Sequence, residues 1–99
     1  DAAYLIPFKA KAWLDLTDRK TSGEHVDSKN IKKHKNDVFR LTELIDPTLT
    51  IKAPHRVYVD VQEFVQRMQN ENIDLKQLGL VGRTKDQILK EIKDLYIAQ

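Results

Sequence analysis

The 99-residue sequence has no cysteine, only three glycines and three prolines, and no long apolar run. Without cysteine there is no disulfide framework, no thiolate zinc site and no cysteine nucleophile. The scarcity of glycine and proline argues against a turn-rich all-β fold. No apolar stretch approaches the roughly 20 residues that cross a bilayer, and no signal peptide opens the chain. We therefore expect a cytoplasmic protein with no membrane partner.

What is present is typical of one small globular domain over residues 1–99. Apolar residues make up 40% and charged residues 32%, and 17 Lys and Arg against 15 Asp and Glu leave a net charge of +2. This balance is far from the large basic excess of an obvious nucleic-acid-binding protein. The chain opens on Asp1 and an apolar cluster (Tyr4, Leu5, Ile6, Phe8). From this start we expect a piece of a longer protein, with self-association through the apolar N-terminus as one option.

Apolar residues recur at helical spacing in four segments, which predicts an all-α bundle of four main helices. The expected helices run from Pro7 to Lys20, from Asp27 or Ser28 to Ile45, from Val57 to Asn70, and onward from a Thr84–Gln87 capping box, with a one-turn fifth helix over Leu75–Leu78. Residues 57–61 alternate like a strand, but the apolar spacing that continues to Met68 favours a helix.

Two aromatic residues and one histidine are expected inside this bundle. Trp13 and Phe8 are predicted to be core anchors rather than platforms for stacked bases. His34 lies in one apolar stripe with Ile31 and Val38, so it should be largely buried. A buried histidine normally has a hydrogen-bond partner, and we expect that partner to be Asp37 or a polar group of the first helix.

The densest charged feature is the segment 31–41 of the second helix. Lys33 and Asp37 are four residues apart and share a helix face, on which Arg40 follows; His34 and Lys35 lie between them. Together with Lys9 of the first helix, such a cluster suits a phosphate and its counter-charge. The same residues also fit a solvated polar face, and Lys9 also fits a side chain extended over apolar surface. Both interpretations stay open from the pattern alone.

No self-sufficient active site is visible. Gly79 to Lys85 lacks the G-x-x-x-x-G-K-[ST] spacing of a phosphate loop. His25 and His55 have no partner at metal-ligand spacing, so we expect no metal site. There is also no nucleophile elbow and no glycine-rich dinucleotide turn, so we expect no catalytic residue in this chain.

Residues 9–41 resemble a known family. Lys9-Ala-Lys-Ala-Trp-Leu14, Arg19 and Ile31-Lys-Lys-His-Lys-Asn-Asp-Val-Phe-Arg-Leu41 are similar to the region behind the catalytic core of AbiEii-type nucleotidyltransferase-like proteins, which occur in bacterial abortive-infection and toxin systems. Lys9 matches the lysine of one family helix, and Lys33 to Asp37 match its K/R-D-x-x-D-like element. His34 replaces the first Asp of that element. The resemblance covers about a third of the chain, and residues 47–99 match nothing in that pattern.

The resemblance implies an accessory helical domain that positions a nucleotide or its acceptor and is not catalytic alone. Lys9, Lys33 and Asp37 would bind nucleotide or phosphate, supported by His34, Lys35 and Arg40. The resemblance implies that residues 1–99 are the C-terminal helical fragment of such a protein. The implied partner is its N-terminal nucleotidyltransferase core, with a nucleic-acid acceptor as a further option. Mg²⁺ and a nucleoside triphosphate are implied for the whole protein, and no cofactor for this chain. The alternatives are a small module that binds nucleic acid or protein, and a purely structural bundle.

Overall fold

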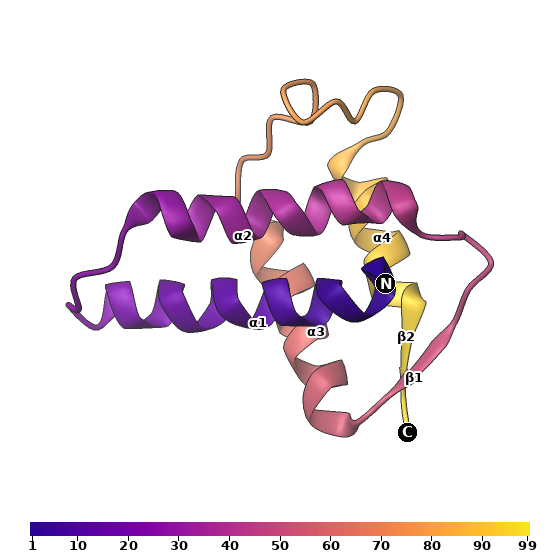
Figure 1. The fold of residues 1–99 in the computed structure, drawn as a ribbon, viewed down its shortest axis with the longest axis horizontal. Helices are drawn as coiled ribbons and strands as arrows, with labels where there is room; N and C mark the ends of the chain where they lie inside the picture. The colour runs from indigo at the N-terminus through magenta and orange to yellow at the C-terminus, as the bar shows by residue number, and fades with distance from the viewer.

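The computed structural model describes all 99 residues, and four helices dominate it (Figure 1). The elements are α1 (Ala2–Thr21), α2 (Ser28–Leu41), the short 3₁₀ helix η1 (Thr42–Leu44), β1 (Ile51–Ala53), α3 (His55–Met68), α4 (Lys85–Leu95) and β2 (Tyr96–Ala98). The predicted four-helix architecture is confirmed. The fold is nevertheless mostly α rather than all-α, because β1 and β2 pair as a small parallel sheet.

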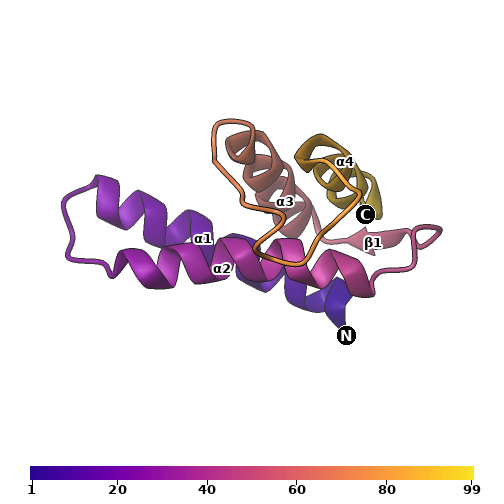
Figure 2. The same cartoon turned by 90° about the horizontal axis from the view of Figure 1, so that it is seen from above.

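The helices form two layers. In Figure 2, α1 and α2 lie side by side as an antiparallel pair, and α3 and α4 pack on one side of that pair. The turn between α1 and α2 begins at Gly23, whose φ of 94° is unfavourable for residues with a Cβ. The amides of Gly23 and Glu24 donate to the carbonyls of Lys20 and Arg19, which is a Schellman ending. Gly23 therefore ends α1 just after Thr21.

The start of α1 differs from the prediction. The helix begins at Ala2, capped by the Asp1 carboxylate, and it includes Pro7. Proline has no N–H to donate to the carbonyl four residues earlier, which is that of Ala3. The hydroxyl of Tyr96 donates to this Ala3 carbonyl instead. A contact 93 residues away in sequence thus satisfies the acceptor that Pro7 leaves free.

Helices α2 and α4 begin with the predicted caps, although some helix ends differ from the predicted positions. Asp27 caps α2 and the Thr84–Gln87 capping box opens α4, both as predicted. Helix α3 begins and ends two residues earlier than expected, and α2 ends at Leu41 before η1. The predicted helix over 75–78 is only a turn, although Asp74 caps it by accepting from the Gln77 amide.

The sheet was not predicted from the sequence. Residues Ile51 to Ala53 pair in register with Tyr96 to Ala98, and the Gln99 amide donates to the Ala53 carbonyl. Helical spacing would place Tyr96 on the apolar face of α4 with Ile92, but the residue lies in β2, buried and close to the first turns of α1.

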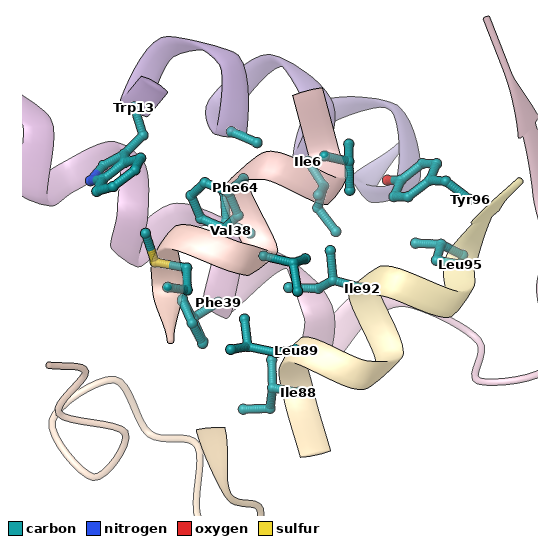
Figure 3. Close-up of a cluster of buried hydrophobic side chains, with 14 of the residues drawn as sticks. Ile6, Trp13, Val38, Phe39, Phe64, Ile88, Leu89, Ile92, Leu95 and Tyr96 are labelled. Atoms are coloured by element: carbon teal, nitrogen blue, oxygen red, sulfur yellow. The ribbon is translucent and has the colours of Figure 1, made fainter. Parts of the chain in front are cut away.

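One core of 17 buried side chains joins both layers (Figure 3). Phe64 of α3 is fully buried, and Trp13 of α1 packs edge-on against it, with ring centroids 5.6 Å apart. Trp13 is thus the predicted core anchor. Phe8 is not, because 75% of its surface is exposed. Phe39, which the sequence did not single out, is fully buried.

Candidate phosphate-binding cluster between α1 and α2

Lys9 and Asp37 meet across the two antiparallel helices. Lys9 Nζ lies 3.1 Å from one oxygen of Asp37, and Arg40 lies 3.7 Å from the other oxygen. The Lys9 and Asp37 side chains keep only 29% and 22% of their exposure, so solvent screens this pair less than a fully exposed one. Because α1 and α2 are antiparallel, the start of α1 lies beside the end of α2 (Figure 2), and this arrangement brings Lys9 to Asp37. We name Lys9, Lys33, Asp37 and Arg40 the seam cluster.

Lys33 and Lys35 take different positions on α2. Lys33 is exposed and makes no ion pair, although it lies one turn before Asp37. Lys35 is largely buried, where it contacts the Glu71 carboxylate at 3.2 Å and the Asn72 carbonyl at 3.3 Å. Lys35 therefore holds the 69–84 connection against α2 and does not join Lys9 and Asp37.

His34 is half-buried beside the seam cluster, but without the predicted hydrogen bond. Its Nδ1 is shielded from solvent and has no partner. Burial lowers the pKa of His34 below its usual 6.5, the positive charges of Lys9 and Lys33 lower it further, and Asp37 opposes them. Between two lysines the neutral imidazole is favoured, and the buried Nδ1 makes no hydrogen bond.

The fold should lose stability through His34 in mild acid. In the unfolded chain His34 accepts a proton near pH 6.5, whereas in the folded chain it does so at lower pH. The free energy of unfolding therefore falls as the pH drops through about 6.5. Urea denaturation of the chain and of His34→Gln between about pH 7.5 and 5 should show a flatter dependence in the variant. The exposed His25→Gln is the control, and an equal slope for wild type and His34→Gln would contradict the assignment.

The apolar N-terminal cluster forms an exposed patch on α1, except for Ile6, which is buried. Tyr4, Leu5 and Phe8 are 64%, 45% and 75% exposed. They lie on the side of the helix opposite Ile6, Ala10 and Trp13, so the first turns of α1 are apolar all round. A groove of about 330 Å³ borders the patch between α1 and β1, with Ala3, Pro7, Ala53 and Tyr96 among its lining residues. The sequence already indicates this patch, because at helical spacing residues 4, 5 and 8 fall on the opposite side of the helix from residues 6, 10 and 13.

Charges elsewhere are mostly paired with one another. A hollow of about 570 Å³ lies between η1 and α4. Around it Arg83 forms ion pairs with Glu91 and Glu43, and Lys90 forms one with Asp94.

No three His, Asp or Glu side chains gather where they could hold a metal ion. None of the helices combines the length and apolar character needed to cross a bilayer. No protein-family model, curated protein or solved structure matches the chain.

Proposed function

We propose that the chain is the accessory helical domain of an AbiEii-type nucleotidyltransferase-like protein in the cytoplasm. The observation that carries the proposal is the Lys9–Asp37 contact. It joins the two segments on which the family resemblance rests, residues 9–14 and 31–41. The proposal gives the domain a positioning role and leaves catalysis to a separate core.

The seam cluster suits the binding of a phosphate. Asp37 is shared by Lys9 and Arg40, and Lys33 has no carboxylate partner. Three cations against one carboxylate leave a local charge of +2. The carboxylate holds Lys9 and Arg40 in place, and Lys33 remains free to contact a phosphate oxygen as a mobile point charge.

The catalytic core would supply the metal chemistry. Since this chain has no group of three metal-ligating side chains, Mg²⁺ would bind to the core, where it offsets the charge of the triphosphate. The exposed patch of Tyr4, Leu5 and Phe8 offers the core an apolar contact surface. Exposed apolar patches commonly mark such contacts.

Removing the Lys9–Asp37 contact should lower transfer activity more than stability. In the protein that combines this chain with its core, Lys9→Ala and Asp37→Ala should each reduce nucleotidyl transfer by about tenfold or more, because a misplaced substrate reacts slowly. The free energy of unfolding should change by about 1 kcal/mol or less. Labelled nucleoside triphosphate with Mg²⁺ or Mn²⁺ measures the first, and thermal denaturation measures the second.

Lys90→Ala and Asp94→Ala provide the control, because they break an exposed ion pair on α4 that involves no residue of the seam cluster. Full activity of the Lys9 and Asp37 variants would contradict the positioning role, and loss of folding would make the contact structural. Incorporation of label by the purified 99-residue chain alone would show that it is not an accessory domain.

A nucleic-acid-binding module is the second candidate. Lys29, Lys32 and Lys33 are exposed along α2 and make no ion pair, which would suit contacts to a phosphate backbone. Oligonucleotide binding by the chain alone that weakens steeply with salt would favour this candidate.

A further inference from the structure

A third hollow lies toward the other end of the α1–α2 pair, away from Lys9. It measures about 300 Å³, at the lower end of the range for ligand pockets. Trp13, Thr17 and Lys20 of α1 line one wall, Ser28, Lys32 and Lys35 of α2 line the other, and Glu71 closes one end. The inference from it is independent of the proposed nucleotidyltransferase role.

Two buried polar atoms of this hollow have no partner. They are the indole N–H of Trp13 and the hydroxyl of Thr17, which lie one helical turn apart on α1. Trp13 is only 3% exposed. In Figure 3 its nitrogen is on the edge of the ring that faces away from Ile6 and Phe64. A buried donor without an acceptor is costly and rare. An acceptor oxygen in the hollow would remove that cost.

The surrounding charge favours an anion. Three ammonium groups line the hollow against one carboxylate, because Glu71 neutralises only Lys35. Lys20 donates to the Ser28 hydroxyl, and Lys32 has no partner. Ser28 is also the first residue of α2, where the positive end of the helix dipole lies. Lys20 and Lys32 therefore remain available for a negatively charged group.

We propose that this hollow binds a phosphoryl group. A phosphate presents several acceptor oxygens in different directions, which suits ammonium, hydroxyl and indole donors that converge from two helices. Lys20 and Lys32 supply the charge, and Trp13, Thr17 and Ser28 supply neutral donors. The group can belong to a free polyphosphate or to the backbone of a nucleic acid.

The single tryptophan of the chain makes the proposal measurable, because its emission comes from Trp13, which lines this hollow. Titration of the 99-residue chain with inorganic pyrophosphate, which does not absorb near-ultraviolet light, should change the Trp13 fluorescence to saturation. Lys20→Gln and Lys32→Gln should each weaken binding by about tenfold, the usual effect of losing a charged hydrogen bond. Thermal denaturation should show that both variants stay folded.

Lys29→Gln is the matched control, because it removes the same charge from α2 but does not line the hollow. It should leave the pyrophosphate affinity within about twofold. If pyrophosphate leaves Trp13 fluorescence unchanged, or if Lys29→Gln weakens binding as much as Lys32→Gln, the proposed site is refuted.

Two further titrations separate the sources of the phosphate, with the same variants. One uses ATP, and the other uses a single-stranded oligonucleotide without terminal phosphates. Binding of the oligonucleotide that depends on Lys20 and Lys32 assigns the hollow to internal phosphodiesters. Binding of ATP but not the oligonucleotide assigns it to free or terminal phosphates. Either result supports the phosphoryl site, and failure of both refutes it for biological phosphates.

Discussion

Phe64→Ala is expected to lower the free energy of unfolding by about 3–5 kcal/mol. The ring is fully buried at the centre of the core, and it packs edge-on against Trp13 (Figure 3). Removing it deletes apolar contact from both helical layers and leaves a cavity that neighbouring side chains fill only in part. Because a domain of this size is stable by roughly 5–15 kcal/mol, the loss is a large fraction of the total. Urea denaturation followed by circular dichroism measures it.

Phe8→Ala is the matched control, since it makes the same substitution at a ring that is 75% exposed. Its effect on the free energy of unfolding should stay within about 0.5 kcal/mol. A large loss at Phe8 and a small one at Phe64 would contradict the burial of Phe64 in the core and the exposure of Phe8 on α1.

Tyr96→Ala should be about as damaging, at roughly 3–5 kcal/mol, because this buried ring of β2 packs near the start of α1. Tyr96→Phe keeps the ring and removes only the hydroxyl. It should cost about 1–3 kcal/mol, since the Ala3 carbonyl then lacks the partner that Pro7 cannot provide. Burial also raises the pKa of Tyr96 above its usual 10.0, so the folded state should lose stability as the pH rises past that value.

A double-mutant cycle with Pro7→Ala isolates the role of the hydroxyl. Alanine at position 7 restores an N–H that can donate to Ala3, so Tyr96→Phe should cost less in that background. Equal costs in both backgrounds would show that the Tyr96 hydroxyl does not replace the missing helical donor. Tyr4→Phe, at an exposed ring, should leave stability nearly unchanged.

The sequence by itself determined the features that depend on residues a few positions apart. Asp27, Asp74 and the Thr84–Gln87 capping box each bond to amides within three residues. Gly23 ends α1 because only a glycine adopts its positive φ without strain. The Lys9–Asp37 contact can also be predicted from the sequence. The short turn makes α1 and α2 antiparallel, so the start of α1 lies beside the end of α2.

Only the tertiary structure decided which apolar side of α1 is buried. The first turns of α1 have apolar residues on both sides, so the sequence does not indicate whether Phe8 or Ile6 is buried in the core. The packing also places Lys35 beside Glu71 rather than beside Asp37. It pairs β1 with β2, although the paired residues are 45 positions apart in the sequence. Three-residue strands carry almost no periodic signal, and their pairing gains free energy only after the helices have brought them together. The Tyr96 hydroxyl likewise reaches Ala3 only in the folded chain.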